Sequence, residues 1–261
     1  FGLMRTVNLA HGTLYLLGAY IGYDVADATG NWYLGVIAGT ASMAVLGVVM
    51  QKVLLGWMQG QELRQALITI GLSIIVADLM LAHWTGLTYQ FSPPDYLLGF
   101  TRFSLFGGFK GYSTYRLFLL GVAIVIGILL WLLLNRTRFG MMVRAGVDDK
   151  EMLGAQGINV PVVFILVFAL GAGLAGFAGV IGGTALSIAP GEDLRYLLSS
   201  LVVVIVGGMG SVGGAAIGAL LIGLAEQYGL AYTPDYGVVY TFIIMVAVLA
   251  VRPHGILGRK E

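Results

Sequence analysis

The stretch YRLFLLGVAIVIGILLWLLL, residues 115–134, decides the fold class of this chain. It holds one charged residue, Arg116, and it has the length of about 20 mostly apolar residues that an α-helix needs to cross a bilayer. Comparable apolar runs recur along the sequence. We expect membrane-spanning helices over residues 13–28, 32–55, 66–84, 115–134, 162–188 and 236–251.

A longer apolar run at 197–228 is interrupted by GGMGSVGG at 207–214. Because the run is too long for one crossing, we expect two shorter helices joined at the glycines. A broken helix that reaches only the middle of the membrane is the alternative. The predicted fold class is therefore all-α, a polytopic transmembrane bundle of about eight hydrophobic segments with one glycine-broken helix.

Composition excludes several classes of protein. Hydrophobic residues make up 58% of the 261 positions and charged residues 10%, whereas a soluble domain carries about 25% charged residues. A net charge of +1 gives no basic field for nucleic acid. There are no cysteines and only three scattered histidines, so neither a disulfide, a thiolate site nor a metal cluster is expected, and no cofactor is indicated.

Lysine and arginine, which favour the cytoplasmic side, predict the orientation. We place ten of these residues on one side: Arg5, Lys52, Arg64, Arg136, Arg138, Arg144, Lys150, Arg252, Arg259 and Lys260. The other four are Arg102, Lys110, Arg116 and Arg195, so the first side is predicted to be cytoplasmic. Residues 1–261 should form a single transmembrane domain with a cytoplasmic loop at 135–161. The chain begins at Phe1 in an apolar pattern, and we expect a first hydrophobic helix to precede it.

Two glycine patterns have a structural and a functional interpretation. The run GMGSVG at 208–213 fits the dinucleotide pattern G-x-G-x-x-G, but no alternating strands and helices follow it, so we interpret it as a hinge in a broken helix. The hinge residues are Gly207, Gly208, Gly210, Gly213 and Gly214. Ser211 lacks the glycine that a nucleophile elbow needs two residues before the serine.

Small residues also recur at four-residue spacing and predict close helix packing, with a substrate-facing role as the alternative. The two stripes are Ala175, Gly179 and Gly183, and Ala215, Ala219 and Gly223.

Polar residues within or beside the apolar segments are the candidates for function, because charge is costly in lipid. They are Asp78, Glu226, and the pair Asn8 and His11, which are three residues apart and would share a helical face. An interhelical hydrogen bond is the structural alternative for the pair. The loop at 135–161 mixes charges of both signs with apolar residues, which suits either docking on a partner protein or a solvated connection.

Six stretches resemble the branched-chain amino-acid ABC permease family, and its first subunit type in particular. They follow one another in the order of that family: MRTVNLAHGTLYLLGAY (4–20), LRQALITIGLSIIVADLML (63–81), FGMMVRAGVDDKEMLGAQGINV (139–160), FALGAGLAGFAGVIGG (168–183), VIVGGMGSVGGAAIGALLIGLAE (204–226) and VRPHGILG (251–258).

The resemblance implies a permease in the bacterial inner membrane that carries no catalytic site. Its implied partners are a second homologous permease subunit, two cytoplasmic ATP-binding subunits and a periplasmic substrate-binding protein. The substrate would be a branched-chain amino acid, with urea or a short amide as the alternative and an ion-coupled secondary transporter as a further one.

The resemblance also implies roles for particular residues. Residues that contact the ATPase would be Arg144, Ala145, Asp148, Asp149, Glu151, Gly157 and Ile158. We place Asn8, His11, Gly12, Thr69 and Ser73 along the substrate pathway. Family members often carry glutamate after the His-Gly pair, where this chain has Thr13, so we expect no fixed negative charge beside the pathway and selectivity that rests on the binding protein.

Overall fold

The computed structural model describes residues 8–58, 60–105, 108–233 and 237–258. Its elements in chain order are α1 (His11–Thr29), α2 (Trp32–Val49), η1 (Met50–Leu55), α3 (Glu62–Trp84), η2 (Asp95–Leu97), β1 (Phe100–Leu105), β2 (Gly108–Ser113), α4 (Thr114–Arg136), α5 (Arg138–Asp148), α6 (Lys150–Ala155), α7 (Val160–Leu186), α8 (Asp193–Gly207), α9 (Val212–Tyr232) and α10 (Gly237–Val251). The prediction of a polytopic helical bundle is confirmed.

The predicted segments all contain helices, but these helices differ in length. Five helices in the described ranges are long and apolar enough to cross a bilayer: Trp32–Leu55, Glu62–Trp84, Thr114–Arg136, Val160–Leu186 and Val212–Tyr232. By contrast α8 has 15 residues, which at about 1.5 Å per residue makes it about 22 Å long, shorter than the hydrocarbon core of roughly 30 Å. The predicted break at the glycine run is confirmed, because α8 ends at Gly207 and α9 begins at Val212.

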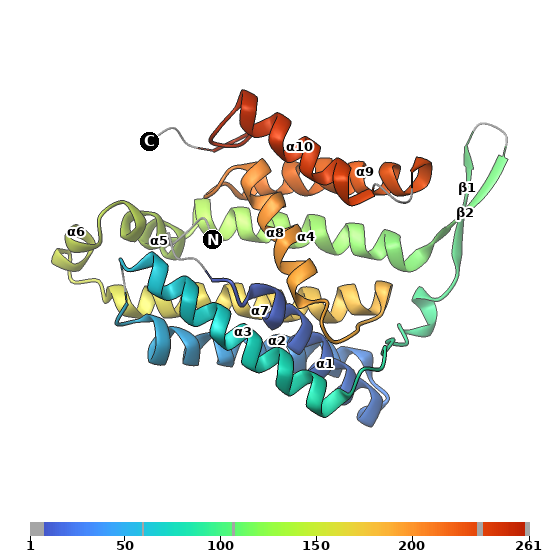
Figure 1. The fold of residues 1–261 in the computed structure, drawn as a ribbon, viewed down its shortest axis with the longest axis horizontal. Coiled ribbons are helices and arrows are strands. Elements are labelled where there is room, and N and C mark those ends of the chain that lie inside the picture. Colours follow the sequence, from blue (N-terminus) through green and yellow to red (C-terminus); the bar gives the residue numbers. More distant parts are fainter. Residues whose placement is uncertain (1–7, 59, 106–107, 234–236, 259–261) are drawn as a thin grey trace.

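The helices form two layers that α8 connects (Figure 1). One layer contains α1, α2, α3 and α7, and the other contains α4, α9 and α10. α8 runs obliquely between the layers, and it contacts α1 in the first layer and α9 and α10 in the second. The hairpin β1–β2 lies at one end of the molecule and α5 and α6 lie at the other (Figure 1). Segments that the charge distribution assigns to opposite sides of the membrane are thus separated along the long axis.

Glycine brings α1, α2 and α7 into close contact. A methyl group on Gly18 would lie 2.5 Å from Cα of Gly176, and one on Gly179 would lie 2.0 Å from the carbonyl oxygen of Tyr15. The predicted stripe on α7 is buried at Ala175, Gly179 and Gly183. Helices in lipid are not driven together by the hydrophobic effect, so van der Waals contact between closely packed backbones stabilises their association. The packing interpretation of this stripe is therefore confirmed.

The second predicted stripe has the wrong register. Ala219 and Gly223 are exposed on α9, and a methyl group on Gly223 would meet no atom within 4 Å. The buried glycines of α9 are instead Gly214, Gly218 and Gly229, and a methyl group on Gly218 would lie 2.5 Å from the carbonyl oxygen of Val203 in α8. The tight turn between α8 and α9 determines which face of α9 meets α8, and spacing alone does not give that face.

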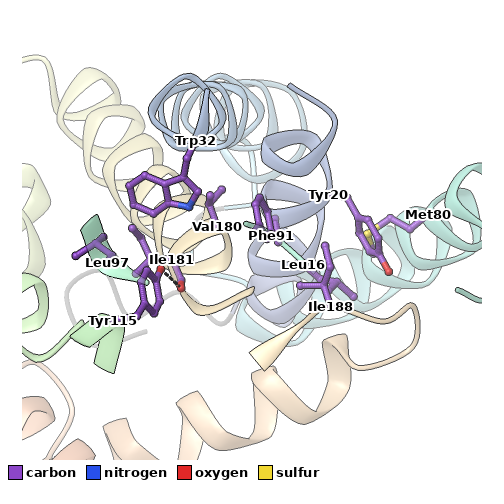
Figure 2. Close-up of a cluster of buried hydrophobic side chains, with 11 residues drawn as sticks. Leu16, Tyr20, Trp32, Met80, Phe91, Leu97, Tyr115, Val180, Ile181 and Ile188 are labelled. Carbon is purple, nitrogen blue, oxygen red and sulfur yellow. Dashed lines mark hydrogen bonds between the residues drawn. The ribbon is translucent and has the colours of Figure 1, made fainter. Parts of the chain in front are cut away.

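An aromatic and aliphatic core joins α1, α2, α3 and α7 (Figure 2). Two of its buried polar atoms are hydrogen-bonded: Tyr115 Oη donates to the carbonyl oxygen of Ile181 at 2.8 Å, drawn as a dashed line in Figure 2, and Trp32 Nε1 donates to Thr184 Oγ1 at 2.9 Å. In hydrocarbon such partners are needed, because an unsatisfied polar group costs several kcal/mol. These bonds fix α4 and α2 against α7. The buried Tyr20 hydroxyl has no hydrogen-bond partner among the described residues.

The two strands were not among the elements expected from the sequence. β1 and β2 pair antiparallel, with Phe100 opposite Ser113 and Leu105 opposite Gly108. A separate bridge joins Tyr89 to Ile188 through backbone hydrogen bonds of 2.9 and 2.8 Å. It ties the connection between α3 and α4 to the segment that leads into α8, and so helps to position the start of α8.

Candidate functional site

The start of α1 is an irregular turn followed by a helix. Asn8 precedes the helix and its Oδ1 accepts a hydrogen bond of 3.0 Å from the Ala10 backbone N–H, while His11, half-buried, is the first residue of α1. The predicted shared helical face of Asn8 and His11 is therefore wrong, because the helix begins after Asn8. The Leu9 backbone N–H donates to Thr69 Oγ1 of α3 at 3.1 Å, which fixes this turn.

Three helices meet at a polar cluster just beyond this turn, which we call the Thr13 cluster: Thr13 of α1, Thr69 and Ser73 of α3, and Asp193 of α8. The Thr13 hydroxyl donates to Asp193 Oδ2 at 3.1 Å and shares a hydrogen bond of 2.5 Å with Ser73 Oγ. Thr69, one turn before Ser73, accepts the Leu9 N–H and donates to the carbonyl oxygen of Gln65 at 2.9 Å. The structure thus brings together two of the predicted pathway residues, Thr69 and Ser73.

The Thr13 cluster lies near the middle of the bilayer. Ser73 is the central residue of α3, which has the length of a full crossing. Beside the cluster, Ala10, directly before α1, and Leu14 of α1 belong to one buried apolar group with Phe168 and Ala172 of α7. A carboxylate at this depth is costly unless polar partners compensate it, and such residues commonly mark functional sites, so Asp193 is a functional candidate.

Asp193 places a carboxylate beside Thr13, where the sequence led us to expect no fixed negative charge. The sequence analysis took Thr13 as the loss of an acid, but a carboxylate from a different helix hydrogen-bonds to that same threonine. Gly12 makes this arrangement possible, because a methyl group there would lie 2.0 Å from the Asp193 carbonyl oxygen and 2.8 Å from the Leu197 nitrogen. Close approach of another helix, rather than open space for a ligand, accounts for Gly12.

Aromatic rings and a second acid lie beside the Thr13 cluster. The rings of Tyr15 and Tyr196 are 4.3 Å apart between centroids, and Tyr196 Oη donates to Glu192 Oε2 at 3.1 Å. Arg195 approaches Glu192 at 3.9 Å, and its side chain is largely exposed. A carboxylate with tyrosine faces and hydroxyls nearby has the chemistry to bind an ammonium group.

Asp78 and Glu226, the other acidic candidates, lie apart from the Thr13 cluster. Asp78 is exposed on α3 beyond Ser73, toward the end of the helix, and Glu226 is half-buried on α9. No hydrogen bond that the structure describes joins either of them to Thr13, Ser73 or Asp193. Of these three acids, Asp193 is therefore the one that hydrogen-bonds within the Thr13 cluster.

The glycine run forms the turn between α8 and α9. Gly208 has φ of +101° and Gly210 has φ of +81°, a backbone region that side chains disfavour. A methyl group on Gly207 would lie 2.3 Å from the carbonyl oxygen of Gly214, whereas one on Gly213 would meet only Leu257 Cδ1 at 3.8 Å. Ser211 Oγ accepts from the Gly214 N–H at 2.9 Å and caps α9, which gives this serine a structural role.

The C-terminal segment closes the same turn. The Ile256 N–H donates to the carbonyl oxygen of Val206 at 2.9 Å, and the Leu257 N–H donates to that of Gly207 at 3.0 Å. These bonds satisfy carbonyl groups that a helix end leaves without partners. Movement at the glycine run, as the hinge interpretation requires, would therefore involve the C-terminal segment.

The loop expected at 135–161 is largely helical. α4 extends to Arg136, α7 begins at Val160, and α5 and α6 lie between them. Buried Val143 and Leu153 face the interior, and a methyl group on Gly146 would lie 3.1 Å from Leu153 Cδ2 and 3.6 Å from Phe164 Cε2 of α7. α5 and α6 thus pack on the start of α7.

Two of the residues predicted to contact an ATPase stabilise these helices themselves. Arg144 Nη1 donates to the carbonyl oxygen of Leu134 at 2.7 Å and to Asn135 Oδ1 at 3.0 Å. Asp149 Oδ1 caps α6 by accepting the N–H groups of Glu151 and Met152 at 3.0 and 2.9 Å.

The other residues predicted to contact the ATPase differ in their solvent exposure. Ala145, Glu151 and Gly157 are exposed, Ile158 is half-buried, and the Asp148 side chain lies outside the described part of the chain. Ala145, Glu151 and Gly157 therefore remain available for contact with another protein.

Comparison with known proteins gives the family. The profile described as branched-chain amino acid transport system / permease component matches residues 1–249. The chain belongs to this permease family. It is a multi-pass membrane protein, as both the family and its helices of spanning length indicate.

The relatives of this permease are similar over nearly their whole length. The high-affinity branched-chain amino acid transport system permease protein BraD of Pseudomonas aeruginosa is 29% identical, with 100% of this chain and 89% of BraD covered. LivH of Escherichia coli K12, named for the same transport, is 28% identical, with 100% and 88% covered. The probable LivH of Methanocaldococcus jannaschii is 28% identical, with 96% and 82% covered. Comparison with solved structures gave no match.

Asp193 was not among the candidate residues that the sequence indicated. Asp193 lies before the apolar run at 197–228, from which the helices of this region were predicted. One signal was available, because an acidic residue directly before an apolar run marks a helix start. Its depth in the membrane follows from the contact of Gly12 with α8, which no local pattern predicts.

Proposed function

We propose that this chain is the membrane-spanning permease subunit of an ATP-driven importer for branched-chain amino acids, located in the bacterial inner membrane. The similarity to BraD and LivH over the full chain carries this proposal. Both relatives are named as permease proteins of branched-chain amino acid transport systems, and neither they nor the family profile names an enzyme.

The substrate passes the Thr13 cluster. A branched-chain amino acid is a zwitterion with an apolar side chain, so its path needs a few polar groups within an apolar wall. Asp193 offers a negative charge for the ammonium group, and Thr13 and Ser73 offer hydroxyls. The start of α8 inside the membrane supports this assignment, since transporters commonly bind substrate near the midplane where helices are broken.

ATP hydrolysis takes place on partner subunits that contact α5 and α6. The inferred partners are two cytoplasmic ATP-binding subunits, a second homologous permease subunit and a periplasmic binding protein. A continuous set of contacts supports this coupling: α5 and α6 pack on α7, α7 packs on α1, and α1 contacts α8 at Gly12. Force applied at α5 and α6 therefore reaches the Thr13 cluster through packed helices.

Two alternatives predict different requirements. Urea or a short amide carries no ammonium group, so its transport would not need Asp193. An ion-coupled transporter would use the Asp193 carboxylate for the coupling ion, and its transport would need an ion gradient instead of ATP.

Uptake into proteoliposomes separates these functions. The chain, co-purified with its ATP-binding and permease partners, should accumulate leucine only when ATP and the substrate-binding protein are both supplied. Uptake of leucine that follows a proton or sodium gradient without ATP would contradict the proposal, as would ATP-driven uptake of urea with none of leucine, isoleucine or valine.

A further inference from the structure

The segment at residues 187–192 connects α7 to α8 without forming a helix of its own (Figure 1). α7 has the length of a full crossing, whereas α8 begins at Asp193, which lies at the depth of Ser73 in the middle of α3. Irregular backbone at membrane depth is tolerated only where protein buries it or where it lines a water-filled cavity. Ile188 is buried, but Gly191 is exposed. The exposed part of this segment therefore borders water or another protein surface rather than lipid.

Glu192 and Arg195 carry opposite charges at the start of α8. Arg195 Nη1 lies 3.9 Å from Glu192 Oε1, and the exposed fractions of the two side chains are 66% for Arg195 and 38% for Glu192. Charged residues within a membrane almost always face the interior of a bundle or a water-filled cavity. Since both residues lie within one helical turn of Asp193, we infer that this face of α8 lines the aqueous pathway.

This ion pair contributes little to stability by itself. An exposed pair contributes about 0–1 kcal/mol, and 3.9 Å is longer than the roughly 2.7–2.9 Å of a strong charge-assisted hydrogen bond. Tyr196 Oη donates to Glu192 Oε2 at 3.1 Å and so holds the Glu192 carboxylate. The Arg195 guanidinium donates no hydrogen bond to any residue that the structure describes. Its planar set of donors is therefore available to bind a carboxylate through two hydrogen bonds.

We propose that Glu192 and Arg195 bind the two charged groups of the transported amino acid, an inference that rests on the proposed function. Arg195 binds the carboxylate and Glu192 binds the ammonium group, which a single carbon atom separates in an α-amino acid. Leu198, exposed one turn further along the same face of α8, contacts the apolar side chain. An amine without a carboxylate would pair with only one of these charges, and uncharged urea with neither. Arg195 thus determines specificity for a zwitterion.

Restoring a positive charge at position 195 tests this role. The chain has no cysteines, so Arg195→Cys can be assembled with cysteine-free partner subunits and modified selectively. ATP-driven leucine uptake at saturating binding protein should fall at least several-fold in Arg195→Cys. Aminoethyl methanethiosulfonate, which adds an ammonium group, should restore most of that uptake, whereas the sulfonatoethyl reagent, which adds a negative charge, should not. A purely structural role of the side chain would not depend on the sign of the added charge.

A second pair of variants needs no chemical modification. Arg195→Lys keeps the positive charge and should retain several-fold more leucine uptake than Arg195→Gln. The matched control Arg116→Gln removes an exposed cation at the start of α4 and should transport leucine as wild type does.

The results distinguish this role of Arg195 from the proposed function. If the wild-type importer accumulated no leucine, the proposed function itself would be wrong. If wild type transported leucine but Arg195→Lys and Arg195→Gln gave equal uptake, or if both reagents acted alike on Arg195→Cys, only the role of Arg195 would be refuted.

Discussion

At the scale of single residues, Asp193 gives the clearest link between structure and transport. Its carboxylate lies within 3.1 Å of the Thr13 hydroxyl, which in turn bonds to Ser73 in the middle of α3. A charged group in this position must be compensated, and a substrate ammonium group would compensate it during transport. The Thr13 hydroxyl keeps the carboxylate oriented when no substrate is present.

Replacement of this carboxylate should impair transport specifically. Asp193→Asn keeps the size of the side chain and removes the charge, and we expect leucine uptake to fall about tenfold or more, since a hydrogen bond to a charged group contributes about 1.5–3 kcal/mol. The measurement is the initial rate of uptake into proteoliposomes at saturating binding protein. Thr13→Val, which removes the hydroxyl but leaves the carboxylate, should have the smaller effect.

A purely structural role for Asp193 would change assembly of the complex as well as the uptake rate. Size-exclusion chromatography should recover the complex of Asp193→Asn intact. If Thr13→Val and Asp193→Asn reduced uptake equally and both reduced recovery of the complex, the residue would serve only to hold α8 against α1.

At the scale of helices and turns, the glycine run shows how far a local pattern determines structure. The sequence predicts its position correctly, because an apolar run at 197–228 is too long for one crossing and GGMGSVGG interrupts it. It does not show which glycines are essential. Gly208 combines positive φ with a close contact, since a methyl group there would lie 2.3 Å from the Gly258 nitrogen, whereas Gly213 has only ordinary contact.

These two positions make a matched pair for mutagenesis. Gly208→Ala should lower the melting temperature of the detergent-solubilised permease and reduce leucine uptake, because the positive φ alone costs about 1–2 kcal/mol and the close contact adds to it. Gly213→Ala, at the first turn of α9, should be nearly neutral in both measurements. Equal effects of the two substitutions would show that the turn does not constrain Gly208 as described.

The same scale shows what the sequence could not give. Runs of about 20 apolar residues predict the long helices well, because lipid requires that length. The register of the α9 stripe and the depth of Asp193 depend on contacts between helices far apart in sequence, Gly218 with Val203 and Gly12 with Leu197. The hairpin β1–β2 was predictable, because aromatic-rich runs lie on both sides of the pair Gly107 and Gly108, a pattern typical of hairpins that was overlooked in the search for spanning helices. Thr69 and Ser73 were predicted because the stretch around them resembles the permease family.

At the scale of the whole molecule, α5 and α6 lie far from the hairpin and pack on α7 (Figure 1). The structure changes which residues are suitable for testing an ATPase contact there. Asp149→Lys would remove the cap of α6, at a cost of about 1 kcal/mol, so its effect would mix helix unfolding with lost contact. Ala145 and Glu151 are exposed and are better choices.

The variants Ala145→Trp and Glu151→Lys should each leave the assembled complex intact and abolish most of the ATP hydrolysis that substrate-loaded binding protein stimulates. Bulk or reversed charge on an exposed contact surface prevents a close fit between the subunits. Arg138→Gln, a change in charge at the opposite end of α5 from Asp148, is the control and should retain stimulated hydrolysis. Normal stimulation in both Ala145→Trp and Glu151→Lys would place the ATPase contact elsewhere.

The position of the Thr13 cluster on the substrate path is the central claim, and the reactivity of a cysteine at Ser73 tests it most directly. The chain has no cysteines, so Ser73→Cys introduces a single thiol in the middle of α3. A charged thiol reagent should modify it in the assembled importer, and leucine-loaded binding protein with ATP should change that rate several-fold. Ile128→Cys, on the exposed apolar face of α4, should stay unreactive. The account would be contradicted if the Ser73→Cys thiol were as unreactive as that control. It would also be contradicted if leucine-loaded binding protein and ATP left its rate of modification unchanged.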